Sequence, residues 1–211
     1  MKQTPKINYY IEMQREIERI KRNGLRPKLA LHACCAPCSS AVLEQLADVF
    51  DITVFFYNPN ISPEAEFRHR LEEQVRLVNE MLPGRGIKVA EGAYEAEEFY
   101  RRVKGHEKDR EGGERCGICF EMRLRKTAEF AKENGMDYFT TTLSISPLKD
   151  AQRLNALGGA LAGEYGVKYL FSDFKKKEGY KRSCALSAEY GLYRQDFCGC
   201  VFSRMERENT Q

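Results

Sequence analysis

The sequence predicts an α/β protein with a doubly wound, mostly parallel sheet and a helical C-terminal extension. Short apolar segments alternate along the chain with longer segments of helical period, which is the pattern of such sheets. The length of 211 residues fits one compact domain. A composition of 42% hydrophobic and 31% charged residues excludes the collagen-like, disordered and membrane classes. We therefore expect one α/β domain over residues 1–211.

The expected elements follow from apolar periodicity and turn residues. An N-terminal helix within residues 1–24 runs from 7 to about 21 and stops at Asn23-Gly24. A strand at 28–33 then leads directly into the run HACCAPC and a second helix. In chain order, the further elements are a strand at 52–57, a helix at 63–81 with a stripe of Phe67, Leu71, Val75 and Val78, a strand at 87–90, helices at 93–103 and from near 116 to 134, a strand at 138–143, a helix at 150–165 and a strand at 168–171.

Residues 172–211 form the expected extension. It contains the basic segment FKKKEGYKR, a helix around 183–193, the run RQDFCGC and a frayed tail from 203 onward. At the other end, the first twenty residues carry charges throughout, and no apolar run approaches the length of a membrane span. These patterns predict a cytoplasmic protein without a membrane partner.

The eight cysteines are the most informative part of the composition. Because the cytosol keeps ordinary thiols reduced, a disulfide framework is not expected here. Cys184 stands alone, and we expect it to be structural. The other seven fall into three tight groups: Cys34, Cys35 and Cys38; Cys116 and Cys119; Cys198 and Cys200. Such clustering indicates metal binding or redox chemistry.

The first group lies between a predicted strand and a predicted helix. A helix amino terminus offers free N–H groups and a positive dipole end, and both favour thiolates. Cys34 and Cys35 can bind one object if the chain turns after them, which the following Ala-Pro pair permits. Cys38 remains open between a substitute ligand, a ligand to a second metal and a packed side chain. His32 is a further candidate, as a core residue, as a hydrogen-bond donor to a sulfur or as a metal ligand.

The second group is a C-x-x-C at the start of a predicted helix. Zinc sites, iron–sulfur clusters and redox dithiols share this spacing. About four thiolates fill a structural zinc site or a cubane cluster. Cys34, Cys35, Cys116 and Cys119 supply that number, although zinc sites more often show paired C-x-x-C motifs.

The third group, Cys198-Gly199-Cys200, differs in kind. A disulfide across one intervening residue closes a small, strained ring, and strained disulfides have more oxidising potentials. The pair therefore suits a redox-active dithiol, with two further metal ligands as the alternative.

Basic residues and tyrosines gather late in the chain. Single-stranded RNA recognition requires cations for phosphates and aromatic faces for bases, whereas a charge run alone is often only a solvated face. The candidate RNA contacts are Lys175, Lys176, Lys177, Lys181 and Arg182, interleaved with or followed by Tyr180, Tyr190 and Tyr193.

Taken together and in this order, five motifs closely resemble the QueH family, the cobalamin-independent epoxyqueuosine reductases. They are HACCAPC at 32–38, RCGICF at 115–120, TTLSISPLK at 141–149, DFKKK at 173–177 and YRQDFCGC at 193–200. The resemblance implies a fold like that of the ATP-pyrophosphatase (adenine nucleotide alpha hydrolase-like) domains. In that fold the first loop normally cradles phosphate, and in this sequence it holds cysteines.

The resemblance also implies the reaction, which is the two-electron reduction of epoxyqueuosine to queuosine at the wobble position of tRNA. It implies a [4Fe-4S] cluster on Cys34, Cys35, Cys116 and Cys119, Cys198 and Cys200 as the redox-active pair, and an unidentified electron donor. An additional iron is left open. Candidate proton donors are Ser146, Lys149 and Tyr193. The rival interpretations are a zinc-stabilised RNA-binding module, a metal-free thiol oxidoreductase and an ATP-dependent tRNA thiolation enzyme.

Overall fold

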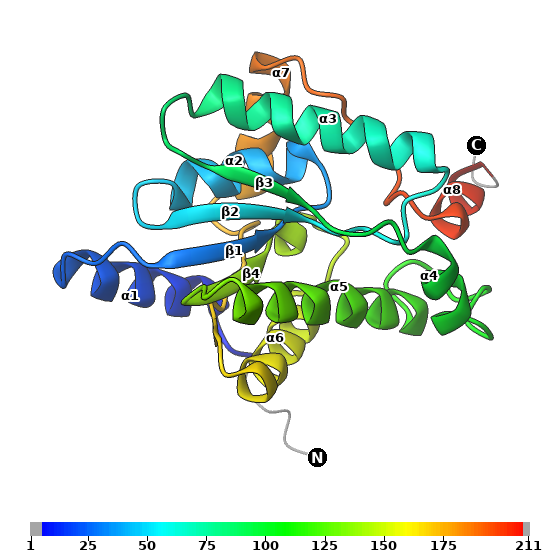
Figure 1. Ribbon diagram of the computed structural model, residues 1–211. Helices are drawn as coiled ribbons and strands as arrows, with labels where there is room; N and C mark the ends of the chain where they lie inside the picture. The colour runs from blue at the N-terminus through cyan, green and yellow to red at the C-terminus, as the bar shows by residue number, and fades with distance from the viewer. Residues whose placement is uncertain (1–5, 209–211) are drawn as a thin grey trace.

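The computed structural model describes residues 6–208 and contains a five-stranded, all-parallel sheet. The strand order is β3-β2-β1-β4-β5, so the sheet grows outward in both directions from β1 (Figure 1). This confirms the doubly wound α/β prediction. The strands are β1 (Lys28–His32), β2 (Asp51–Phe56), β3 (Lys88–Glu91), β4 (Tyr138–Thr141) and β5 (Lys168–Tyr169).

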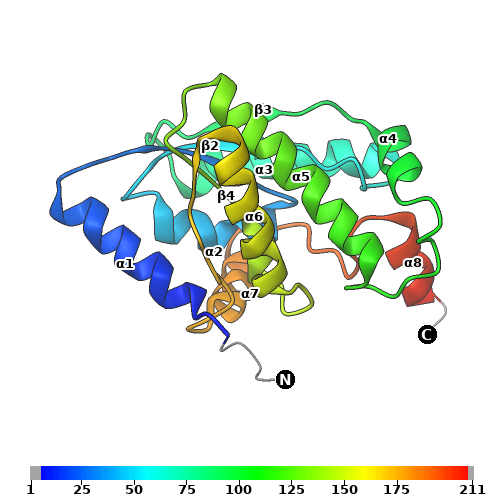
Figure 2. The same cartoon turned by 90° about the horizontal axis from the view of Figure 1, so that it is seen from below.

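Helices cover both faces of this sheet. They are α1 (Tyr9–Arg22), α2 (Ala36–Leu46), α3 (Glu64–Met81), α4 (Ala96–Arg102), α5 (Glu114–Glu133), α6 (Ala151–Tyr165), α7 (Gly179–Glu189) and α8 (Val201–Glu208). One face carries α2, α3 and α7, and the other carries α5 and α6 (Figures 1 and 2). Among residues 6–208, no helix is both long and apolar enough to cross a bilayer.

The central strand β1 is buried on both faces. Leu29 and Leu31 pack in a core cluster with residues of α1, α2 and α7, whereas Ala30 packs in a second cluster with residues of α5 and α6. Side chains alternate between the faces of a strand, so a strand covered on both sides needs apolar residues at every position. The run Leu-Ala-Leu meets that need.

Several expected bounds were wrong in detail. The strand expected at 168–171 ends at Tyr169, and the helix expected around 183–193 is α7, which begins at Gly179 and ends at Glu189. On α3, Val75 is 41% exposed, while Arg70 and Gln74 are buried. The buried face of this helix is therefore rotated away from the expected stripe, because polar side chains with partners inside the protein replace apolar ones.

The expectation of a frayed tail was wrong for residues 203–208, which belong to α8. Residues 209–211 lie outside the described residues. Phe202 of α8 packs against a small cluster that joins Phe99 of α4, Cys119 and Met122 of α5, and Cys200. Docking of α8 on α4 and α5 therefore brings the Cys-Gly-Cys segment to the amino-terminal part of α5 (Figure 1).

The order of the strands also locates the site. The strand order reverses between β1, which leads to α2, and β4, which leads to α6. In open parallel sheets, ligands bind outside the carboxyl ends of the strands at such a point. The residues that leave β1 there are the first cysteine group.

Two glycines of α6 test how this face is packed. A Cβ added at Gly158 would overlap the ring of buried Tyr169, whereas one added at Gly163 meets nothing within 4 Å. We expect Gly158→Ala to lower the free energy of unfolding by about 1–3 kcal/mol through overpacking. Gly163→Ala should raise it by up to about 1 kcal/mol through helix propensity. Denaturant unfolding of both variants measures this, and equal effects would contradict the packing described.

Candidate metal and thiol centre

The first cysteine group forms a compact triad of sulfurs. The sulfur atoms of Cys34, Cys35 and Cys38 all lie within 4.8 Å of one another, and those of Cys34 and Cys35 are 3.8 Å apart. Cys35 is the extended N-cap residue of α2, and Pro37 occupies the first turn. The chain thus turns where the sequence requires it, and the triad lies at the positive end of the α2 dipole.

The three thiols share protons unequally. Hydrogen bonds from Cys35 and Cys38 to the Cys34 sulfur hold the pKa of Cys34 well below its usual value. The same interaction with Cys34 raises the pKa of Cys35 to about 12 and raises that of Cys38. The hydroxyl of Thr142 lies 4.0 Å from the Cys34 sulfur. One thiolate within a group of three sulfurs is a donor set that soft metal ions favour.

The other two groups meet in a second, smaller cavity. Cys116, Cys119, Cys198 and Cys200 all line a cavity of about 20 Å³ between α5 and the segment before α8. Burial raises the pKa of Cys119 to about 12 and that of Cys200 to about 11. A third thiol pair within electron reach of the cluster ligands was expected from the sequence, but not its place beside the C-x-x-C rather than beside the first cysteine group.

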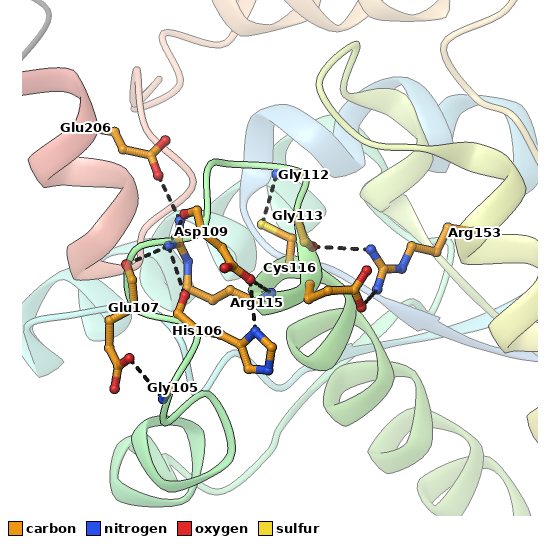
Figure 3. A network of polar contacts seen from close by, with 11 residues as sticks. Gly105, His106, Glu107, Asp109, Gly112, Gly113, Arg115, Cys116, Arg153 and Glu206 are labelled. Atoms are coloured by element: carbon orange, nitrogen blue, oxygen red, sulfur yellow. Dashed lines mark hydrogen bonds and ion pairs between the residues drawn. The ribbon is translucent and has the colours of Figure 1, made fainter.

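Cys116 is held by the loop that precedes α5. The Gly112 N–H donates to the Cys116 sulfur at 3.2 Å. Beside it, the buried guanidinium of Arg115 donates to the carbonyls of His106, Glu107 and Asp109 (Figure 3). Arg115 also forms an ion pair with Glu206 of α8 at 2.9 Å. One arginine therefore joins the loop, the C-x-x-C helix and α8.

The Cys-Gly-Cys segment is held from both sides. The buried Arg70 of α3 donates to the carbonyl of Cys198 at 3.3 Å. At the start of α8, the Ser203 N–H donates to the Cys200 sulfur at 3.4 Å, and the Ser203 hydroxyl accepts from the Cys198 N–H at 3.2 Å. Gly199 has a φ of +114°, a conformation that favours glycine. Glycine between the cysteines is thus required by the backbone.

A larger cavity of about 510 Å³ opens over the triad. Ser146 and Lys149, two of the predicted proton donors, line it together with the triad. Lys149 and Cys198 line both the larger and the smaller cavity, so the two cavities adjoin. Burial disfavours the charged amine of Lys149, but the sulfurs of Cys198, Cys34 and Cys38 raise its pKa overall. Lys149 is therefore a cation between the two groups of thiols.

His32 is a core residue and does not contact a sulfur. Its Nδ1 lies 2.9 Å from the Thr141 hydroxyl and its Nε2 lies 3.1 Å from the Tyr57 carbonyl. Because a carbonyl only accepts, Nε2 carries the proton and Nδ1 accepts from Thr141. Burial lowers the pKa of His32 to about 4, so the ring is neutral. Both ring nitrogens are occupied, and His32 is not available as a ligand.

The remaining predicted residues lie farther out. Tyr193 is not among the residues that line either cavity, and its hydroxyl contacts Glu66 at 3.2 Å. Among the candidate RNA contacts, Lys175, Lys181 and Arg182 form ion pairs with Asp173, Glu178 and Glu44. No ion pair involves Lys176 or Lys177 within residues 6–208. Tyr180 lines the larger cavity, and the guanidinium carbon of Arg194 lies 5.3 Å from the centre of its ring.

The buried arginines around the thiols were not predicted from the sequence. Arg70 and Arg123 are 2% and 1% exposed. Each falls on the inward face of a helix, Arg70 one turn after Phe67 and Arg123 one turn after Phe120. The helical spacing of each arginine from a buried phenylalanine could have indicated that the arginine is buried too.

Comparisons with known proteins agree with these features. The chain matches the family model described as epoxyqueuosine reductase QueH over residues 29–206. A protein of that name from Staphylococcus epidermidis is 44% identical over 206 residues, covering 96% of this chain and 87% of the relative. Its namesake from Streptococcus pyogenes is 43% identical over 205 residues, covering 96% and 80%. The one from Thermotoga maritima is 38% identical over 180 residues, covering 84% and 90%. The chain belongs to the QueH family of epoxyqueuosine reductases.

Proposed function

We propose that this protein reduces epoxyqueuosine to queuosine at the wobble position of tRNA. The observation that carries the proposal is the placement of seven thiols in two adjoining cavities at the switch point of the sheet. The names of the relatives supply the reaction. A thiol-rich centre is what an epoxide deoxygenation needs, because two electrons and two protons must reach one carbon–oxygen site.

A [4Fe-4S] cluster fits the donor set of this centre. We assign Cys34, Cys35, Cys116 and Cys119 as its ligands, one pair from each cavity. The triad geometry favours Cys38 as a competing ligand, or as a ligand to an additional iron, because its sulfur lies with those of Cys34 and Cys35. When bound, the cluster supplies electrons one at a time.

Cys198 and Cys200 are assigned as the redox-active pair. Oxidation of two thiols to a disulfide releases two electrons and two protons. Conversion of an epoxide to an alkene consumes two electrons and two protons and releases water. The pair therefore balances the reaction, and an electron donor not yet identified returns the disulfide to the dithiol. Their position beside Cys116 and Cys119 supports transfer between the pair and the centre.

Lys149 and Ser146 line the cavity in which the substrate would lie. Cleavage of the first carbon–oxygen bond of an epoxide leaves an alkoxide on the neighbouring carbon, and this oxygen leaves as water only after it has been protonated. The Lys149 ammonium, whose positive charge the sulfurs stabilise, can hold and protonate that oxygen. The Ser146 hydroxyl accepts from the Leu148 N–H at 3.3 Å and can still donate its own proton.

The tRNA partner, the fold relationship and the location are further parts of the proposal. The Tyr180 ring, with the Arg194 guanidinium beside it, offers a surface for a base at the larger cavity, and the lysines of residues 175–181 lie nearby in the chain. The parallel sheet with its first loop at the switch point supports an ATP-pyrophosphatase-like fold. A tRNA-modifying role supports a cytoplasmic location.

Replacement of cluster ligands tests the metal assignment. We expect the iron and sulfide content of Cys34→Ser and of Cys116→Ser after anaerobic purification to be at least about tenfold below that of the parent protein. Visible absorbance should be lost as well, since an alcohol is a poor ligand for iron. Cys184→Ser, on α7 and outside both cavities, is the matched control. Colour retained in Cys116→Ser but lost in Cys38→Ser would replace Cys116 by Cys38 in the ligand set.

Replacement of the redox pair tests its separate role. Cys198→Ser and Cys200→Ser should keep iron and colour but lower queuosine formation by at least about 10³-fold, because the two-electron carrier is lost. The measurement is mass analysis of tRNA nucleosides from a strain that lacks the native enzyme and expresses each variant. Full conversion of epoxyqueuosine by the double serine variant would show that the pair is dispensable.

Removal of the Lys149 charge tests the proposed role of Lys149 as a proton donor. Lys149→Met should lower the single-turnover rate on epoxyqueuosine-containing tRNA by about 10²–10⁴-fold, the usual contribution of a general acid. Lys149→Arg keeps a cation and should lose less. Iron content and tRNA binding are measured alongside. An unchanged rate in Lys149→Met would remove Lys149 from the reaction.

A further inference from the structure

Arg123 is a buried cation that has no acidic partner among the residues that the structure describes. It lies on α5 one turn after Cys119 and is 1% exposed. Its Nε donates to the Cys119 carbonyl at 3.3 Å, and its guanidinium lies over the Phe120 ring at 5.7 Å. Its Nη2 has no hydrogen-bond partner, and no ion pair within residues 6–208 involves Arg123. A buried charge left in this state is costly.

The groups that compensate Arg123 are sulfurs. Arg123 lines the smaller cavity with all four of its cysteines and with Lys149. Burial opposes the charged form of Arg123, yet Cys119, Cys198, Cys34 and Cys116 together raise its pKa. In return, Arg123 acts to lower the pKa of Cys34 and Cys119. Arg123 is thus placed where it faces thiols of both cavities.

The other two buried arginines at the site form ion pairs with carboxylates. Arg115 is likewise buried, with 2% of its surface exposed, but it donates to three carbonyls and pairs with Glu206. Arg70 pairs with Glu66 at 2.6 Å. These two arginines hold backbone and helices together. Arg123 alone among the three lacks a carboxylate within the described residues.

We propose that Arg123 is the counter-cation of the sulfur-bound metal centre and a positioning residue for its redox chemistry. The inference rests on the metal centre proposed above. A thiolate-bound cluster is anionic, and each electron that it accepts adds a negative charge. A fixed cation nearby stabilises the reduced state more than the oxidised state. Arg123 therefore raises the reduction potential of the centre and strengthens the binding of the metal.

The charge of Arg123 has opposite consequences with and without metal. In the metal-free protein, burial raises the pKa of Cys116, Cys119 and Cys200, so most thiols around the guanidinium are neutral and give it little counter-charge. An apolar side chain of similar length should then support the fold at least as well. In the metal-loaded protein, the same replacement removes an attraction. A residue that only filled space would instead stabilise both states equally.

The test compares three full-length variants in both states. Arg123→Met removes the charge and Arg123→Lys keeps it. Arg125→Met is the control, because Arg125 lies on the same helix but pairs with Glu121 and Glu164 away from the cavities. Thermal unfolding of metal-free and anaerobically loaded protein gives the rise in midpoint on loading. Potentiometric titration of the visible absorbance gives the reduction potential.

We expect Arg123→Met to unfold no earlier than the parent when metal-free, to gain less stability on loading, and to have a lower reduction potential. Arg123→Lys and Arg125→Met should match the parent in the rise of the unfolding midpoint on loading and in the reduction potential. If Arg123→Met fails to load metal but Arg123→Lys loads it, the inference is also supported. Equal destabilisation of Arg123→Met in both states, an unchanged potential, or failure of both Arg123 variants to load would overturn the inference. If the parent protein binds no iron, the metal centre itself fails.

Discussion

Convergence of three helix amino termini on one edge of the sheet is the constraint on which the rest of this structure depends. Cys35 caps α2, Cys116 lies in the first turn of α5, and Cys200 directly precedes α8. Each of these ends presents free N–H groups and the positive end of a helix dipole. Gly112 and Ser203 N–H groups donate directly to sulfur. These helix ends favour an anionic cluster bound to the sulfurs, whereas burial raises the pKa of the free Cys119 and Cys200 thiols.

The scaffold around that edge is held together by separate sets of contacts. β1 is buried on both faces and fixes where the first cysteines leave the sheet. Phe202 anchors α8 to α4 and α5, and Arg115 adds polar contacts between the same elements. Consequently, the Cys-Gly-Cys segment is held beside the C-x-x-C, although about 80 residues separate them in the chain.

Much of the fold and the residue types of the site could be predicted from sequence. Alternating strands and helices, the switch point at the end of β1 and the cysteine groups all follow from local pattern. The pairing of Cys198 and Cys200 with Cys116 and Cys119 could not be predicted, since it depends on α8, whose single turn of apolar contact at Phe202 is too short to show a period. His32 lies in the core, which was one of its expected places, but Thr141 and Tyr57 occupy its ring nitrogens, so it neither binds a metal nor donates to a sulfur. The buried arginines were missed because their compensating charges come from distant cysteines.

The proposed reaction requires iron held at this edge by sulfurs from two distant stretches of chain. Anomalous diffraction at the iron absorption edge, from crystals grown without oxygen, locates such iron. We expect iron peaks within bonding distance of Cys34 and Cys35 on one side and of Cys116 and Cys119 on the other. Crystals of protein with full tRNA-reducing activity that show no iron at this edge would contradict it.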